Sequence, residues 1–146
     1  AIEKTNQEIP SVNICLEDGT WSGLTFHGVP GGHEFTSFIL GIYNVAGPGQ
    51  KIEQTYLERI DKINKEINIK IIVSLSCTMC PELVTSAQRI ASLNKQITTE
   101  VYDIQHFKQL KDQYQIMSVP CMVINDQKVV FGKKNIEQIL EIIENV

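Results

Sequence analysis

From residue 68 onward, the order of apolar and polar positions follows the periods of strands and helices. The apolar run Ile69–Leu75 predicts a buried strand, and the alternating segment Thr98–Ile104 predicts a second strand. Between them, apolar residues recur every three or four positions, which predicts a helix from Thr78 to about Asn94. The apolar face of that helix carries Cys80, Leu83, Val84, Ala87, Ile90 and Ala91. This part of the chain therefore begins as strand, helix, strand.

Two more helices and two more strands complete this part of the chain. The apolar residues are Phe107, Leu110 and Tyr114 in the first helix and Ile136, Ile139, Leu140 and Ile143 in the last. Between the helices, Cys121–Ile124 and Val129–Phe131 are predicted strands, and Asn125–Lys128 has the composition of a hairpin turn. The predicted order is β-α-β-α-β-β-α, which is the order of the minimal thioredoxin fold.

The first 67 residues repeat part of this pattern. The segment Ile9–Ile14 is similar to Val119–Ile124, because each places an X-Pro step before an apolar run. A turn, a second short strand and a helix are predicted after each segment. The helix in the first copy carries Phe35, Phe38, Ile39, Ile42 and Tyr43. Gly47-Pro48-Gly49 ends this helix, and an amphipathic pattern over Ile52–Ile67 predicts a connecting helix.

Two cysteines lie where the predicted strand Ile69–Leu75 meets the predicted helix that follows it. Cys77 and Cys80 form a C-x-x-C motif. The N-terminus of a helix stabilises a thiolate, and only the thiolate attacks a disulfide. Cys77 is therefore the predicted nucleophile, and Cys80, one turn later on the apolar face, is predicted to resolve the mixed disulfide. Thr78 and Met79 are predicted to contact the partner. A zinc half-site and two inert buried cysteines are the alternatives, although a zinc site normally has four ligands and no second ligand pair is present.

The X-Pro step before the fifth predicted element belongs to the same candidate site. By its position in the fold, Pro120 is predicted to be cis beside the two cysteines and to present the backbone of Val119 to an incoming extended chain. A trans proline that starts an edge strand is the alternative. Pro10 is the counterpart in the first copy and is also predicted to be cis. Cys121 is predicted to be a small inert strand residue, with an off-path disulfide or metal ligation as alternatives, and Cys15 is predicted to be a core residue.

Composition narrows the class of protein. The 146 residues include 42% hydrophobic and 21% charged residues, which indicates a globular chain. The net charge of −4 and the absence of a basic run exclude an extended nucleic-acid surface. No apolar stretch approaches the ~20 residues that span a membrane, and no signal peptide is visible at the start. We therefore expect a cytoplasmic protein whose thiols are reduced by default.

The expected fold class is α/β and thioredoxin-like. One complete thioredoxin fold that bears the C-x-x-C motif is preceded by a half fold without a cysteine motif. Residues 1–50 are predicted to form the partial ββα subdomain, residues 51–67 the connecting helix, and residues 68–146 the redox domain. The sequence contains neither G-x-G-x-x-G nor a P-loop. A dithiol domain of this kind must therefore receive its electrons from another protein or domain.

Two sequence strings resemble one family. S-L-S-C-T-M-C-P at residues 74–81 and G-G-H-E-F-T-S at residues 31–37 resemble the N-terminal domain of the flavoprotein component of alkyl hydroperoxide reductase. This resemblance implies two fused thioredoxin folds, of which the first has lost its cysteines and is truncated here. It also implies that Glu34 is an acid near the C-x-x-C motif. An exposed acid at the start of a helix is the alternative for Glu34.

These observations together predict a thiol–disulfide relay. The resemblance implies that electrons pass from a flavoprotein disulfide reductase, separate or fused, through Cys77 and Cys80 to a peroxiredoxin-like disulfide. FAD and NAD(P)H are expected on the reductase and no cofactor on this chain, apart from its own redox-active disulfide. A free glutaredoxin-like donor and a metal-binding or scaffold module are the alternatives. If the half fold leaves a sheet edge open, we expect that edge to pair with another chain, as in a homodimer, or with the part of the first thioredoxin fold that is truncated here.

Overall fold

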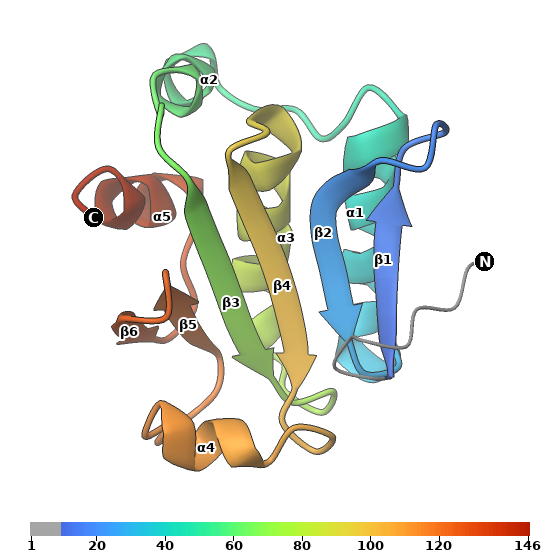
Figure 1. Ribbon diagram of the computed structural model, residues 1–146, viewed down its shortest axis with the longest axis vertical. Coiled ribbons are helices and arrows are strands. Elements are labelled where there is room, and N and C mark those ends of the chain that lie inside the picture. Colours follow the sequence, from blue (N-terminus) through green and yellow to red (C-terminus); the bar gives the residue numbers. More distant parts are fainter. Residues whose placement is uncertain (1–9) are drawn as a thin grey trace.

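The strands of the protein form one continuous sheet. The computed structural model describes residues 10–146, and its six strands lie in the order β1-β2-β4-β3-β5-β6 (Figure 1). Their bounds are Ser11–Cys15 for β1, Trp21–His27 for β2, Ile67–Val73 for β3, Ile97–Asp103 for β4, Cys121–Ile124 for β5 and Lys128–Phe131 for β6. β2 and β3 pair with β4 in parallel, and the β1–β2, β3–β5 and β5–β6 pairs are antiparallel. The strand β2 of the first copy thus lies directly beside β4 of the second.

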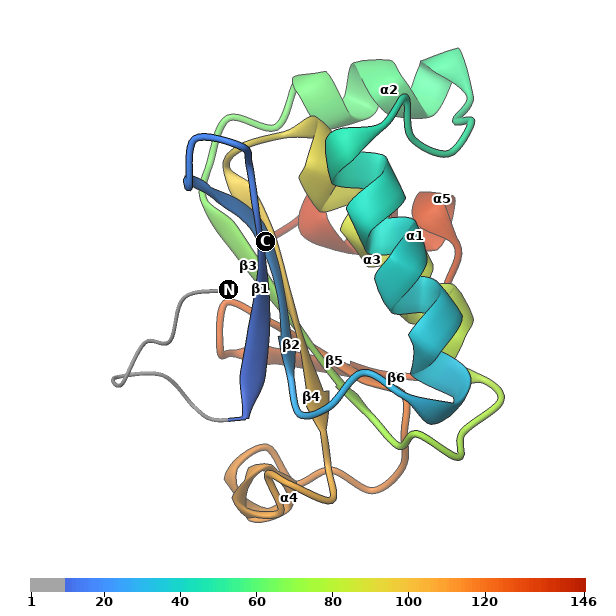
Figure 2. The same cartoon turned by 90° about the vertical axis from the view of Figure 1, so that its right-hand side faces the viewer.

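The helices lie mostly on one face of this sheet. The α-helices are α1 (Phe35–Ala46), α2 (Gln54–Asp61), α3 (Cys80–Leu93), α4 (Gln109–Gln113) and α5 (Ile136–Ile143), and a 3₁₀ turn, η1 (Gly32–Glu34), precedes α1. α1, α3 and α5 cover one face (Figure 2). α4 lies at the end of the sheet where β3 and β4 finish, and α2 lies at the opposite end (Figure 1). This is the expected thioredoxin-like α/β fold, and the predicted types of the helices and strands are confirmed.

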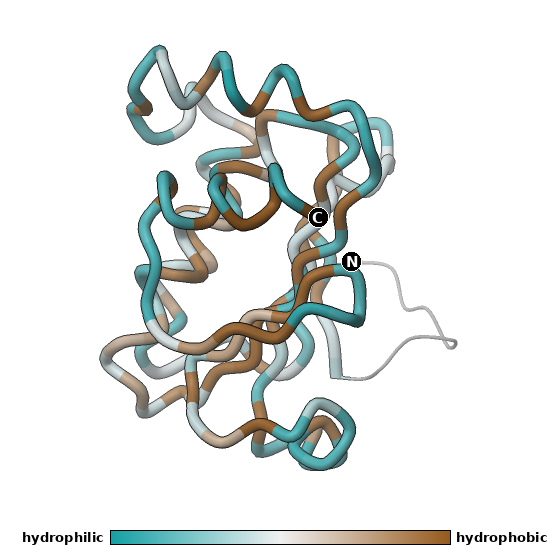
Figure 3. The backbone as a smooth tube through the Cα atoms, turned by 90° about the vertical axis from the view of Figure 1, so that its left-hand side faces the viewer, coloured by the Kyte–Doolittle hydropathy of each residue, from teal (hydrophilic) through white to brown (hydrophobic). Residues whose placement is uncertain are grey.

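Two hydrophobic clusters hold the layers together. The larger cluster lies between the sheet and α1, α3 and α5, and it includes Leu24 and Phe26 of β2 as well as Ile69 and Ile71 of β3. Residues from the first fifty positions therefore share one core with the C-x-x-C fold. Because successive strand side chains point to opposite faces, the other face has its own, smaller cluster. Its buried residues are Ile72, Tyr102, Phe107, Leu110, Ile116, Cys121 and Val123. Figure 3 shows hydrophobic residues concentrated on the strands and recurring along the helices, whereas most turns are hydrophilic.

The connecting helix is shorter than predicted. The helical pattern over Ile52–Ile67 is realised only in α2, which ends at Asp61, and Ile67 is the first residue of β3. The side-chain amide of Asn94 explains this end, since its Nδ2 donates to the carbonyl oxygens of Ile60 at 2.8 Å and Ile63 at 2.9 Å. These bonds satisfy carbonyls at the end of the helix that would otherwise have no partner. The chain can then turn into the strand.

The apolar stripe predicted for the first long helix faces mainly outward. In α1, Phe35, Ile39, Ile42 and Tyr43 are exposed, whereas the buried residues are Ser37, Gly41 and Asn44. α1 contacts α3 through a hydrogen bond, because Gln88 Nε2 donates to the Ser37 carbonyl oxygen at 2.9 Å. A Cβ on Gly41 would lie 2.8 Å from the oxygen of the Gln88 side chain. The two helices therefore meet along small and polar residues.

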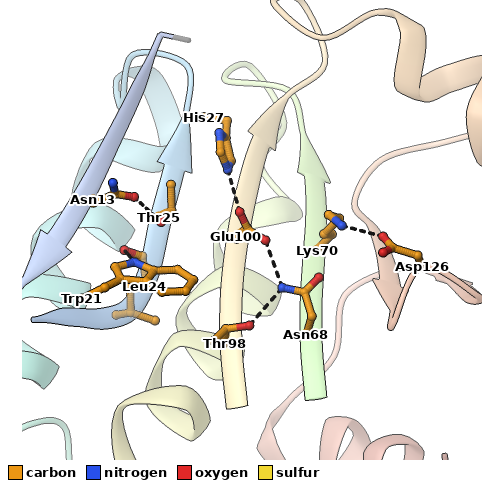
Figure 4. Close-up of polar contacts among 10 residues, drawn as sticks. All are labelled: Asn13, Trp21, Leu24, Thr25, His27, Asn68, Lys70, Thr98, Glu100 and Asp126. Carbon is orange, nitrogen blue, oxygen red and sulfur yellow. Dashed lines mark hydrogen bonds and ion pairs between the residues drawn. The ribbon is translucent and has the colours of Figure 1, made fainter. Parts of the chain in front are cut away.

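A polar network ties the strands of the two copies together on the face opposite α1 and α3 (Figure 4). His27 Nε2 lies 2.9 Å from Glu100 Oε1, and Asn68 Nδ2 donates to Glu100 Oε2 at 2.9 Å. Burial opposes ionisation of Glu100, but the hydrogen bonds to His27 and Asn68 outweigh it and lower the pKa of that carboxyl. The His27 ring also stacks on Tyr102 with centroids 4.1 Å apart. No sequence pattern indicated this group, because its members come from three strands.

Candidate redox-active site

The C-x-x-C motif lies at the junction between β3 and α3. Cys77 lies in a turn in which its N–H donates to the Ser74 carbonyl oxygen at 3.0 Å, and α3 begins at Cys80, two residues later than predicted. Pro81 occupies the first turn of α3, where a missing N–H costs little. Cys77 is half-buried and Cys80 is fully buried. Cys77 is therefore the cysteine that a partner can reach.

The two thiols differ in burial. Burial is the main cause that raises the pKa of Cys80 well above its usual value, and its contact with Cys77 adds to this effect. The backbone at Ser74 opposes the shift, and the negative charge of Glu34 adds to it. Cys80 consequently keeps its proton at neutral pH until its surroundings change. A half-buried first cysteine and a buried second cysteine suit a reaction in which the second attacks only after the first has reacted.

The predicted cis peptide bond before Pro120 is confirmed. Val119 is half-buried and packs against the larger cluster, to which Cys77 and Cys80 also belong. Thr78 and Met79 are exposed beside the cysteines. The roles of these residues in partner contact stay predictions. The bond between Ile9 and Pro10, for which a cis geometry was also predicted, lies outside the described residues.

Glu34 comes from the first copy and lies against the site of the second. Its side chain is fully buried, so the exposed position that was the alternative is wrong. Burial raises the pKa of the Glu34 carboxyl, and a hydrogen bond donated by Ser37 Oγ to Oε1 at 2.5 Å partly opposes this shift. Oε2 has no hydrogen-bond partner among the described residues. A buried carboxyl with a raised pKa beside a dithiol has the properties of a group that can hold or release a proton there.

The turn before Glu34 is attached directly to the loop that precedes Cys77. The His33 N–H donates to the Leu75 carbonyl oxygen at 2.9 Å. Gly32 has φ +53°, and a Cβ at this position would lie 2.5 Å from the Leu75 carbonyl oxygen. Only glycine therefore fits without a shift of the backbone. The sequence indicated a turn at these glycines but not the loop that they contact.

The other two cysteines do not join the site. Cys121 is buried in the smaller cluster, on the opposite face of the sheet from Cys80, and burial raises the pKa of its thiol to about 11. The alternative in which it engages Cys77 or Cys80 is wrong for this reason. Cys15 is exposed, so its prediction as a core residue is also wrong. Ile14 belongs to the larger cluster, but the register of the pairing with β2 shifts between Ile14 and Cys15, the last residue of β1.

Residues 10–146 offer neither a metal cluster nor a membrane-spanning helix. They contain no group of three or more His, Cys, Asp or Glu side chains that could hold a metal ion. None of the helices in this range is both long and apolar enough to cross a bilayer.

The fold and the position of the C-x-x-C motif define a thioredoxin-type domain. The profile of the thioredoxin domain family matches residues 67–144, and the chain belongs to this family. The N-terminal domain of the alkyl hydroperoxide reductase AhpF of Enterococcus faecalis is a close structural match, with a TM-score of 0.88 and 40% identity. That match covers 93% of this chain and 65% of the solved chain.

Curated relatives are similar in sequence over almost the whole chain. A protein named NADH dehydrogenase from Ferdinandcohnia aciditolerans is 35% identical over 140 residues, or 95% of this chain. The alkyl hydroperoxide reductase AhpF of Staphylococcus aureus is 31% identical over 138 residues, or 94% of this chain. The chain spans only 27% of the length of each of these relatives. It is therefore similar to one domain of larger oxidoreductases.

Proposed function

We propose that Cys77 and Cys80 form a dithiol that carries electron pairs between proteins. The observation that carries this proposal is the pairing of a half-buried Cys77 with a buried Cys80 at the start of α3. Val119 packs against the larger hydrophobic cluster, to which Cys77 and Cys80 also belong. Its backbone can therefore lie alongside an extended chain that reaches Cys77. Membership of the thioredoxin domain family supports thiol–disulfide exchange as the reaction.

The reaction takes place in two exchanges. The Cys77 thiolate attacks one sulfur of a partner disulfide, the partner S–S bond breaks, and the released partner thiolate takes up a proton. Cys80 then loses its proton and attacks Cys77 Sγ. This step forms the Cys77–Cys80 disulfide and releases the second partner thiol. Two electrons pass to the partner, and a reductase must return two electrons and two protons to restore the dithiol.

The donor is a flavoprotein disulfide reductase that uses FAD and NAD(P)H, and the acceptor is a peroxiredoxin-like disulfide. The names of the relatives, NADH dehydrogenase and alkyl hydroperoxide reductase, support this path. Their greater length leaves room for a flavin domain fused to a region like this one. A cytoplasmic location agrees with a dithiol that is kept reduced.

The test of the relay is its redox equilibrium. We expect a reversible two-electron transition of the full chain between about −290 and −200 mV in dithiol buffers, read by alkylation and mass. Cys77→Ser and Cys80→Ser should each abolish the transition, whereas the control Cys15→Ser should not. A pair that never oxidises would refute the relay.

Glu34 serves as the proton acceptor for Cys80. Its charge adds to the causes that raise the pKa of the Cys80 thiol, so Glu34→Gln should lower that pKa and speed alkylation of Cys80 in a Cys77→Ser background at fixed pH. Glu82→Gln removes an exposed acid from the first turn of α3 and is the control. In the presence of Cys77, Glu34→Gln should slow closure of the mixed disulfide. Unchanged closure would remove Glu34 from the mechanism.

Association of two copies through the sheet edge is a separate part of the proposal. β1 and β6 are the outer strands of the described sheet, and an outer strand can pair with another chain. Sedimentation equilibrium over a range of concentrations measures this directly. A monomer at every concentration would refute the homodimer.

A further inference from the structure

A groove extends from the candidate site along α4. Its volume is about 410 Å³, and its lining includes Ile104, Lys108, Lys111, Ile116, Met117 and Val119. It lies between the turn after β4 and the segment that precedes Pro120. The redox mechanism above uses only Val119 of these residues.

The groove and the dithiol share Val119. This residue lines the groove and packs against the cluster to which Cys77 belongs. A chain that is held at Cys77 and extends along the backbone of Val119 is therefore led toward α4. The groove is in the correct place to receive residues that flank the partner cysteine.

The walls of the groove combine positive charge with apolar surface. Lys108 and Lys111 are exposed and three residues apart, which places them on one side of the helical turn. Neither belongs to an ion pair found among residues 10–146. Two such positive charges side by side are notable in a chain whose net charge is −4.

The apolar part of the wall comes from several side chains. Ile104 and Ile116 lie beside Met117, which is 85% exposed. Contiguous exposed apolar surface, rather than a single exposed side chain, marks surfaces that bind other proteins, and here Met117 lines the groove together with the half-buried Ile104 and Val119. Lysines alone would attract any anion, whereas this mixture favours a segment with both acidic and apolar residues.

We propose that this groove binds an extended segment of the acceptor protein in which acidic and apolar residues flank the reactive cysteine. The inference rests on the proposed relay and adds the chemical class of its partner. Complementary charge at such a surface speeds association more than it strengthens binding. The electron transfer itself is the two-step exchange described above.

The test compares two peptides that differ only in charge. Each contains one cysteine, held as a mixed disulfide with mercaptoethanol and flanked on both sides by leucine alternating with either glutamate or lysine. We expect the reduced full chain to react with the acidic peptide about tenfold faster at low ionic strength. This preference should disappear at about 1 M salt, where the screening length falls to about 3 Å. Equal rates with the two peptides would overturn the proposal.

Charge-reversal variants locate the effect. The double substitution Lys108→Glu with Lys111→Glu should reverse the preference between the peptides. The matched control, Lys62→Glu with Lys95→Glu, changes two exposed lysines that precede β3 and β4, at the opposite end of the sheet, and should keep it. If the control variant loses the preference equally, net charge rather than the groove is responsible and the proposal fails.

Two small disulfides complete the experiment. Hydroxyethyl disulfide carries no charge, so its reduction should depend on Cys77 and not on either lysine pair. If the wild-type chain reduces no disulfide at all, the relay fails; if it reduces hydroxyethyl disulfide but shows no charge preference, only the groove proposal fails. Glutathione disulfide has carboxylates but no apolar segment. If Lys108→Glu with Lys111→Glu slows the reduction of glutathione disulfide by the same factor as the reaction with the acidic peptide, the assignment of the groove to a protein segment would be overturned.

Discussion

At the scale of single residues, Glu34 makes stability depend on pH. Burial raises the pKa of this carboxyl above its ordinary value of 4.5, so the folded chain keeps a proton that the unfolded chain has already lost. The stability contributed by this proton is fully present below pH 4.5 and is lost as pH rises through the folded value. Glu34 therefore acts against folding at alkaline pH.

The Glu34→Gln substitution tests this sign. Glutamine keeps the shape of the side chain without its charge, so the free energy of unfolding of the variant should exceed that of the wild type increasingly as pH rises. Urea denaturation from about pH 4 to pH 9 measures the difference. A difference that grows toward acid pH would show that the ionised carboxylate is the form stabilised by the fold.

Gly32 offers a second prediction at this scale. Gly32→Ala places a methyl group against the Leu75 carbonyl oxygen, in addition to the strain of a positive φ. We expect the variant to lose about 1–3 kcal/mol of stability. Gly19→Ala is the matched control, because Gly19 also has a positive φ, +88°, but has nothing within 4 Å of an added Cβ. Equal losses in the two variants would mean that the contact with Leu75 contributes nothing.

At the scale of secondary-structure elements, α5 depends on its first turn. Asn135 Oδ1 accepts from the Gln138 N–H at 2.9 Å, and Gln138 Oε1 accepts from the Asn135 N–H at 2.9 Å. Asn135→Ala removes this capping box and should cost about 0.5–2 kcal/mol, measured by thermal or urea unfolding. Asn64→Ala, at an exposed asparagine in the loop between α2 and β3, is the control and should change stability by less than ~0.5 kcal/mol. Similar effects of both variants would contradict the importance of the cap.

The types of the elements were predictable because each depends on residues close in sequence. Period and turn composition located five of the strands and predicted that another short strand follows β1 without giving its bounds, and the C-x-x-C motif with Pro120 located the candidate site. The direction in which α1 faces was not predictable, because it depends on Gln88 reaching Ser37 from another helix. The exposure of Cys15 was likewise not predictable, because it lies where the register between β1 and β2 shifts, and that shift depends on the pairing of the two strands.

The sequence also could not show which residues of the two copies meet. Glu34 was associated with the dithiol through a family resemblance, not through spacing. The pairing of His27 with Glu100 joins two strands that are far apart in sequence. Such contacts follow from the order of strands in the sheet, which no local pattern specifies.

At the scale of the whole molecule, the shared sheet and core predict cooperative unfolding. Trp21 is the single tryptophan and lies on β2 in the first copy, so its fluorescence reports on that part of the chain. Far-ultraviolet circular dichroism reports on all helices and strands. We expect the two urea transitions to coincide. A tryptophan transition at lower urea would show that the first copy unfolds as a separate unit.

The pairing of β2 with β4 has a further consequence for how the chain is made. Synthesis delivers β1, β2 and α1 long before the ribosome has produced β4. Until then, β2 can pair only with β1, and its buried residues Leu24 and Phe26 have neither β4 beside them nor α3 to cover them. Pairing across such a separation in sequence is slow. The interval between the synthesis of β2 and that of β4 is therefore when the nascent chain is most open to aggregation and when a chaperone has the most to protect.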